Sequence, residues 1–400
     1  MTRNDKKYEV DPYLYVLLAF TFAITLPGLY LGLFKIHVSP VLGSMVFGVA
    51  IFGAAFILSW AAEAIQVDIS ESLAVAILAL LAVLPEYAVD FVFTWKSAHD
   101  PQQAHYAIAN MTGANRLLVG LGWPFVLFLY VLFKKKKAVV LHSSQRVEIF
   151  YLAAATIYSF TIPLKGSLTL IDTAILVSLF GLYTRRMAQM HSEEPEMVGP
   201  PRIVVNLPTA RRRLVTYLFF AFSGIVIFFV TEPFAESLVA MGARIGVNEF
   251  LLVQWLAPIA SESPEFIVAA VWTIRGAASS AMKALISSKV NQWTLLIGTI
   301  PLVYAISGRA VKPFVLDSLQ QHELILTAAQ SLFAVAVLVN LKLDRRDGLL
   351  LLVLFTAQLV IEQIRLEVAI AYLVLAVVFL ILHRRSLLPA ARYGLGIRGK

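Results

Sequence analysis

The sequence predicts an all-α, polytopic membrane protein, and three observations support this fold class. Of the 400 residues 59% are hydrophobic and only 14% are charged, and the mean hydropathy is +0.78. A soluble protein of this length could not bury so much apolar surface, whereas a lipid bilayer accepts it on the outside. The apolar residues also form about 12 runs of spanning or near-spanning length, without the strict alternation of a membrane β-barrel.

The apolar runs give the order of the expected helices. The last two runs are the weakest, because polar residues around Glu362 and Arg365 separate them and the run before this break is short. We expect membrane helices near residues 13–34, 41–62, 70–95, 104–133, 147–163, 168–187, 212–240, 249–274, 280–308, 323–341, 349–363 and 366–383.

Basic residues indicate the orientation of these helices. Clusters of Lys and Arg share one side of the membrane with the N-terminus, at 134–137, 185–186, 211–213, 345–346 and 384–385. The positive-inside rule therefore predicts that both termini are cytoplasmic. These topology markers account for the net charge of +8, so nucleic acid is not an expected partner. We expect an integral protein of a prokaryotic cytoplasmic membrane whose partners are lipid and inorganic cations; the oligomeric state is left open.

A polar linker divides the sequence into two halves. Residues 189–211 are rich in glutamate and proline, as is typical of a connector outside the membrane. A plain tether is the simplest role for this linker, and a partner-binding segment is the alternative. We expect an N-terminal tail with an extra helix at 1–40, a first half at 41–188, a second half at 212–363, and an extra helix with a basic tail at 364–400.

An internal repeat crosses the linker. The pair Pro85-Glu86 in the first half recurs as Pro264-Glu265 in the second, and neighbouring apolar residues match at the same separation. An odd number of expected helices lies between the starts of the two copies, which inverts the second copy in the membrane. We therefore expect two inverted five-helix repeats, as in secondary transporters whose helices break at the binding site. Pro85 and Pro264 are the expected helix-breaking residues.

Each copy places two acidic residues on one helix face. Glu86 and Asp90 are four residues apart, and Glu262 and Glu265 are three apart with Ser261 beside them. A carboxylate at bilayer depth costs about 2.5–3.5 kcal/mol, so acids that recur beside proline indicate a function. Carboxylates and freed carbonyls are the oxygen ligands that hard cations prefer. The alternatives are a buried ion pair for Glu86 and Glu265, and a solvated or helix-end charge for Asp90.

The next helix of each half supplies amide side chains. Asn110 and Asn115 lie in the first half, and Asn291 lies in the second. Amide oxygens bind sodium or calcium well, although small polar residues also pack membrane helices against one another. We interpret these asparagines as site residues, with packing as the alternative.

These paired stretches resemble the alpha repeats of the cation/calcium antiporter superfamily, and most closely its sodium/calcium exchanger branch. That family has a Gly-Thr-Ser-x-Pro-Glu helix, followed by a helix that carries Asn or Asp and then Gly-Ser-Asn. The match covers 70–95 with 104–125 and, less well preserved, 249–274 with 280–301. The resemblance implies an inverted-repeat helical core that exchanges calcium for sodium or protons.

The same resemblance implies that Glu86 and Glu265 are the central ligands and that Asn110 stands at a further ligand position. In the second half that position falls near Ile286 or Ser287, so the family's usual amide or acid is missing there.

Three of the departures from the family pattern introduce charged residues. Glu262 stands at the family's serine position, Lys289 replaces the glycine of the second Gly-Ser-Asn triplet, and Arg116 follows Asn115. We expect Lys289 to pair with Glu262, because two buried charges are more tolerable together than apart. The alternative is that Lys289 snorkels to the cytoplasmic surface. When paired, the ammonium would take a sodium position or release a proton as a cation enters, so Lys289 and Arg116 are expected to modulate the site.

The sequence thus predicts a secondary active cation antiporter, not an enzyme. The expected reaction is exchange of Ca²⁺ for Na⁺ or H⁺ by alternating access, with Glu86 and Glu265 as the metal ligands at the membrane midplane. The alternatives are a proton-coupled or monovalent-cation (Na⁺/H⁺) exchanger of the same fold, and a non-transporting membrane scaffold or sensor. The chain has no P-loop and no cysteine, and its histidines are scattered, so no cofactor is expected beyond the transported ions.

Overall fold

The computed structural model describes residues 8–68, 84–190 and 197–396, and most of them are helical. Eight helices in these ranges are long and apolar enough to cross a membrane. The prediction of an all-helical integral membrane protein is therefore confirmed. The expected span at 70–95 lies only partly within the described residues, where it forms helix α4 (Leu84–Ser97).

The chain divides into two compact units, and each unit draws on both halves of the sequence. Unit 1 takes the described residues of 1–92 and 188–264, and unit 2 takes those of 93–187 and 265–400. The chain therefore passes from one unit to the other inside α4, at the end of α9 (Leu170–Ala188) and inside α12 (Glu249–Arg275). The expected division of the sequence into consecutive halves stays a prediction.

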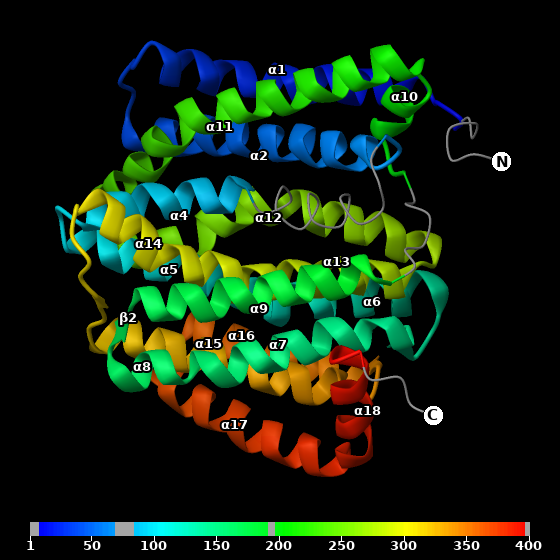
Figure 1. Cartoon of the computed structure of the whole chain (residues 1–400). Helices are drawn as coiled ribbons and strands as arrows, with labels where there is room; N and C mark the ends of the chain where they lie inside the picture. The colour runs from blue at the N-terminus through cyan, green and yellow to red at the C-terminus, as the bar shows by residue number, and fades with distance from the viewer. Residues whose placement is uncertain (1–7, 69–83, 191–196, 397–400) are drawn as a thin grey trace. The chain divides into compact units, whose positions relative to one another are not determined.

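Three long helices of unit 1 pack side by side (Figure 1), with a short helix against α2. A glycine lets two of them approach closely, because a side chain on Gly32 would collide with the Phe229 backbone. The helices are α1 (Tyr13–Leu33), α2 (Pro40–Ile65), α10 (Pro201–Val205) and α11 (Thr209–Ile245).

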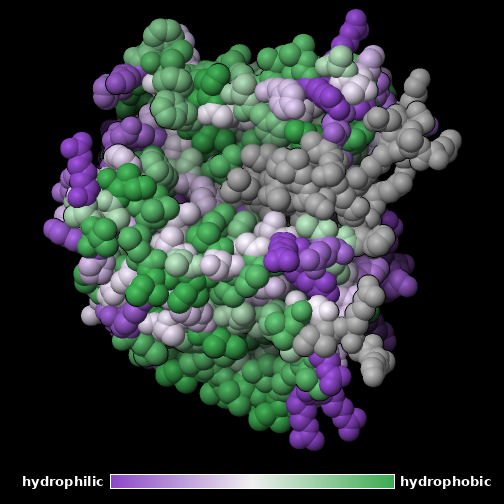
Figure 2. All heavy atoms as spheres, in the orientation of Figure 1, coloured by the Kyte–Doolittle hydropathy of each residue, from purple (hydrophilic) through white to green (hydrophobic). Residues whose placement is uncertain are grey.

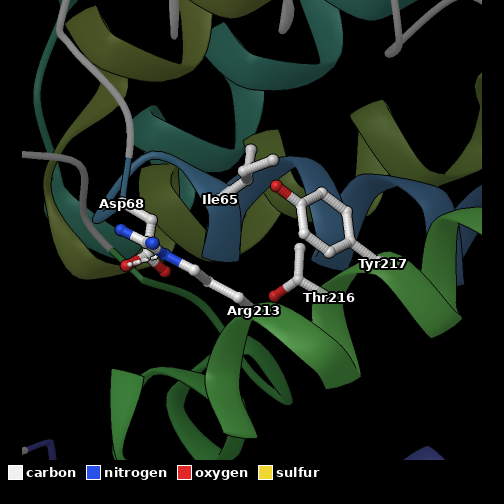
Figure 3. A pocket seen from close by; sticks show the side chains of 5 residues that line it. All are labelled: Ile65, Asp68, Arg213, Thr216 and Tyr217. Atoms are coloured by element: carbon white, nitrogen blue, oxygen red, sulfur yellow. Dashed lines mark hydrogen bonds and ion pairs between the residues drawn. The ribbon is translucent and has the colours of Figure 1, made fainter. Parts of the chain in front are cut away.

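An ion pair ties the end of α2 to the start of α11. Arg212 donates to both carboxylate oxygens of Asp68 at 2.7 Å, and Arg213 donates to one of them at 3.3 Å. The hydrogen bonds from Arg212 are the main reason that the pKa of Asp68 lies below its ordinary value. Asp68 and Arg213 line a pocket of about 230 Å³ together with Ile65, Thr216 and Tyr217, and Figure 3 shows these five side chains.

Apart from α4 and α12, which the two units share, unit 2 holds the other described helices and two short antiparallel strand pairs. β1 (Ala138–Val140) pairs with β4 (Lys342–Asp344), and β2 (Ser167–Leu168) pairs with β3 (Phe314–Val315). The first pairing brings the segment after helix α6 (Trp123–Lys134) beside the segment before helix α16 (Arg345–Val360). Seven of the other described helices of unit 2 lie outside the two stretches that contain a π-helical turn. They are α7 (Arg146–Ser159), α8 (Thr161–Lys165), α9 (Leu170–Ala188), α15 (Ser318–Leu338), α16 (Arg345–Val360), α17 (Arg365–Leu382) and α18 (Arg384–Gly394). Two 3₁₀ turns accompany them, η2 (Ser143–Gln145) and η4 (Glu362–Ile364).

Two helical stretches of unit 2 each contain a π-helical turn. A π turn inside an α-helix often marks a functional site, and here it follows the asparagine that the two copies share. In the first copy α5 (Gln102–Leu117) continues through η1 (Leu118–Gly122) into α6 (Trp123–Lys134). In the second copy α13 (Ala278–Asn291) continues through η3 (Gln292–Leu296) into α14 (Ile297–Ser307).

One side of α17 is an apolar surface. Figure 2 shows hydrophobic side chains where Figure 1 draws this helix, and Ile370, Val374 and Ile381 are among its exposed residues. On its other side Tyr372 and Ala376 are buried where α17 packs against α15. This division is typical of a helix between a protein interior and lipid.

Candidate cation site

The acids of the first copy are buried on α4. Glu86 is 1% exposed and Asp90 is 3% exposed, four residues apart on the same helix. The alternative interpretation of Asp90 as a solvated or helix-end charge is wrong, because this residue lies inside α4 and is almost completely buried. Pro85 lies in the first described turn of α4, so its expected role in breaking the helix stays a prediction.

The second copy places its polar residues on α12. Ser261 and Glu262 are buried, whereas Glu265 is partly exposed. Ser261 and Glu262 belong to unit 1, as Glu86 and Asp90 do, and Glu265 is the first residue of α12 that belongs to unit 2. Four of the predicted site residues are thus buried polar groups of unit 1.

Helix α12 continues through Pro264 without interruption, so the expectation that this proline breaks the helix is wrong. The physical reason is that a proline removes only one backbone donor, and with it the bond to the carbonyl four residues before it, so the remaining backbone hydrogen bonds can carry the helix past it.

The amide of Asn110 is buried in α5. It is 0% exposed, and neither its Oδ1 nor its Nδ2 has a hydrogen-bond partner among the residues that the structure describes. Leaving a buried polar group in this state costs about 1–3 kcal/mol. A bound cation would take the amide oxygen as a ligand, so Asn110 fits the position that the family resemblance gives it.

Within the described ranges no three His, Asp or Glu side chains come together as a metal cluster.

Lys289 is fully buried, and Asn115 binds its ammonium. The Lys289 Nζ donates to the side-chain oxygen of Asn115 at 2.8 Å and to the Asn115 carbonyl oxygen at 3.2 Å. It also lies 4.4 Å from the ring centroid of Trp293. The alternative that Lys289 snorkels to the surface is wrong, because helices α6 and α7 and the turn η1 pack around α13. Its pairing with Glu262, a residue of the other unit, stays a prediction.

The π turns are built by polar and small residues. Asn291 is buried at the last position of α13, and its carbonyl accepts a hydrogen bond from the Thr294 hydroxyl at 3.3 Å. The same hydroxyl donates to the carbonyl of Val290 at 2.6 Å. In η1 a side chain on Gly120 would collide with the ring of Phe355 from α16, so only glycine allows this packing.

Arg116 is buried, and side chains from two other helices of unit 2 bind its guanidinium. It donates to a carboxylate oxygen of Glu323 on α15 and, at 2.5 Å, to the side-chain oxygen of Gln358 on α16. Arg365 on α17 donates to the second oxygen of Glu323 at 2.6 Å. Because Glu323 compensates its charge, Arg116 is suited to position α5; its expected role in modulating the site stays a prediction.

Glu148, Glu323 and Arg365 are among the buried charged residues of unit 2 that were not predicted from the sequence. Glu148 on α7 is 0% exposed, and neither of its carboxylate oxygens has a hydrogen-bond partner in another described residue. The signal was present in the sequence, because each of these residues lies within or at the edge of an apolar run.

Comparisons with known proteins bear on both copies of the repeat. The family model described as sodium/calcium exchanger protein matches residues 39–187 and 215–364. The crystal structure of the H⁺/Ca²⁺ exchanger CAX is similar to this chain with 42% sequence identity and a TM-score of 0.93, covering 96% of this chain and 98% of CAX. A comparison with curated protein sequences gave no match.

Two more distant structures share the fold. Native YfkE is 16% identical with a TM-score of 0.62, over 88% of this chain and 99% of its own. The sodium-calcium exchanger NCX_Mj is 14% identical with a TM-score of 0.54, over 80% of this chain and 99% of its own. Because the family model covers most of the sequence and both repeats, the chain belongs to the sodium/calcium exchanger protein family.

Proposed function

We propose that this chain is a secondary active antiporter that exchanges Ca²⁺ for protons, with Na⁺ as the alternative counter-ion. The observation that carries this proposal is the 42% identity, over 96% of the chain, to a protein described as an H⁺/Ca²⁺ exchanger. The buried carboxylates Glu86, Asp90 and Glu262 add to it, since acids at bilayer depth are costly unless they serve a function.

In this proposal Glu86 and Glu265 are the carboxylates that bind either Ca²⁺ or protons. Ionised carboxylates attract the divalent cation, whereas protonated ones are neutral and release it. Because the same groups cannot do both at once, a gradient of one ion drives the other without ATP. The supporting ligands that we propose are Asp90, Asn110, Asn115, Ser261, Glu262 and Asn291, with Lys289 and Arg116 modulating their charge.

The membrane topology is part of the proposal. We infer about 12 transmembrane helices in two inverted five-helix repeats, with an extra helix at each end. The π turn that interrupts the corresponding helix of each copy supports the repeat. The basic clusters support cytoplasmic termini, in the cytoplasmic membrane of a prokaryote, where lipid and inorganic cations are the partners.

Flux measurements on the full chain in proteoliposomes test the proposed function. We expect radiolabelled Ca²⁺ uptake when a proton gradient is imposed. When a Ca²⁺ gradient is imposed instead, we expect the pH of the lumen to change, with protons moving against the direction of Ca²⁺. A Na⁺ gradient applied at constant pH decides between the two counter-ions. Flux of Na⁺ against H⁺ without any Ca²⁺ movement would favour the monovalent exchanger. If no gradient moves any of these ions, the antiporter proposal fails.

A further inference from the structure

We propose that the ammonium of Lys289 is a tethered cation: it fills a monovalent-cation position that Asn115 and Trp293 form, and it thereby keeps Na⁺ out. This inference rests on the proposed function, and it deepens that function by naming the residue that restricts the counter-ion to protons.

The surroundings of the Lys289 Nζ have the composition of a small cation site. Two oxygens of one residue, the Asn115 side-chain amide and backbone carbonyl, lie at 2.8 and 3.2 Å. The face of the Trp293 ring lies 4.4 Å away, within the range in which an aromatic ring attracts a cation. Amide and carbonyl oxygens are also ligands for hard cations, so the position would suit a Na⁺ ion if the ammonium were absent.

Other contacts hold the residues that surround the Lys289 ammonium in place. The Asn115 amide is fixed because its Nδ2 donates to the carbonyl of Met111 at 2.8 Å, which turns its oxygen toward Lys289. Asn115 lies near the end of α5, shortly before η1, and Trp293 lies within η3. Each copy of the repeat therefore contributes one wall next to its own π turn.

Charge explains why the tether would exclude Na⁺. Lys289 and Asn115 are both fully buried, and two like charges in a desolvated position repel strongly. The next charge along α5, that of Arg116, is compensated by Glu323 and does not take part. A Na⁺ ion could thus bind Asn115 only if the ammonium moved away or lost its charge.

A set of variants at Lys289 tests this inference by equilibrium binding of radiolabelled Na⁺ to the purified full chain. Lys289→Met keeps the apolar stem and removes the charge, and we expect it to bind Na⁺ about tenfold more tightly than the wild type. Lys289→Arg keeps a positive charge and should not gain affinity. Lys283→Met, on the same helix but only half-buried, is the matched control and should also gain nothing. In the double variant with Asn115→Leu the gain should disappear.

The inference is overturned if Lys289→Met binds Na⁺ no better than the wild type, or if the gain survives the loss of Asn115. If Lys289→Met does not fold, Lys289→Gln provides an uncharged side chain that can still donate to Asn115, and the same comparison decides. Wild-type Ca²⁺ flux, measured separately, tests the proposed function. The Na⁺-binding results can therefore contradict the role of Lys289 while Ca²⁺ transport is confirmed. Conversely, a lack of Ca²⁺ transport would contradict the proposed function while the Na⁺-binding results still support the role of Lys289.

Discussion

Arg116 on α5 and Glu323 on α15 form an ion pair in which both side chains are almost completely buried. Arg365 on α17 binds the second oxygen of the same carboxylate at 2.6 Å, so one acid holds two arginines from different helices. A buried charge strongly destabilises the folded state once its partner is removed. The pair therefore fixes the helix that carries Asn110 and Asn115 within unit 2.

Removing the acid should destabilise the fold. Glu323→Gln leaves two guanidinium groups without a counter-charge, and breaking a buried pair in this way costs about 3–5 kcal/mol. We expect a clear fall in Tm, measured in detergent by the loss of the monodisperse peak after heating. Glu367→Gln, an exposed acid on α17, is the control and should leave Tm unchanged. The double variant Arg116→Met with Glu323→Leu should lose less than the sum of the single effects; additive losses would contradict a pairwise interaction.

Glu86→Gln and Glu265→Gln should abolish Ca²⁺ exchange without unfolding the chain. An amide keeps the shape of the carboxylate, but it neither carries the charge that attracts Ca²⁺ nor binds an exchangeable proton. We expect flux to fall at least about a hundredfold, which corresponds to about 2.7 kcal/mol. Radiolabelled Ca²⁺ uptake into proteoliposomes measures this, again with Glu367→Gln as control. Normal flux in both variants would instead favour a site elsewhere in the chain.

The Asp68–Arg212 pair predicts a pH dependence of stability. The folded-state pKa of Asp68 is below its ordinary value, so the pair contributes stability above the unfolded pKa of about 3.9 and loses it as the pH falls through the folded pKa. Asp68→Asn should lower stability at neutral pH by about 1–3 kcal/mol. Thermal unfolding of both proteins across the acid range should show their difference shrinking below about pH 4. Arg213→Gln, which removes the longer and more exposed contact, should cost about 0–1 kcal/mol. A difference that persists in acid would show that Asp68 acts through packing instead.

Glu148 predicts a stabilising substitution. Its carboxylate is completely buried on α7 without a hydrogen bond to another described residue, so burial of the ionised form is unfavourable. Glu148→Gln removes the charge at nearly constant volume, and we expect it to raise the stability at alkaline pH by about 1–2 kcal/mol. The gain should vanish in acid, where the wild-type carboxyl is itself neutral. If the variant is less stable in alkali, the charge of Lys283, which acts on Glu148, stabilises the carboxylate after all.

The helical membrane fold could be predicted from composition and from the length of the apolar runs, because lipid imposes both constraints on the sequence. The acids beside proline could also be predicted, since a carboxylate in an apolar run stands out by its cost. The resemblance of the paired Pro-Glu stretches to one family was confirmed by the family model, which matches both halves.

Interactions between distant parts of the chain could not be predicted. Nothing in the sequence around Arg116 indicates that Glu323 and Gln358 bind it, because these partners come from helices far along the chain. The continuation of α12 through Pro264 was not predicted either, because a proline within an apolar run can end a helix or lie inside it, and the sequence alone does not decide between the two. Lys289 was expected either at the surface or beside Glu262, and its contact with Asn115 depends on how α5 and α13 pack.

The π turns η1 and η3 set the rotational phase of the helices that follow them. A π turn accommodates one more residue per turn than an α-helix, so the side chains after it point about 100° away from where a regular α-helix would place them. Helical-wheel reasoning that starts at Asn115 or Asn291 therefore assigns the wrong face to α6 and α14. Deleting a single residue within 118–122 would convert the turn to regular α-helix and keep the Trp123 side in register, because the lost residue and the lost π turn shift the phase by equal and opposite amounts; inserting a residue there would instead rotate that side away from the packing around it.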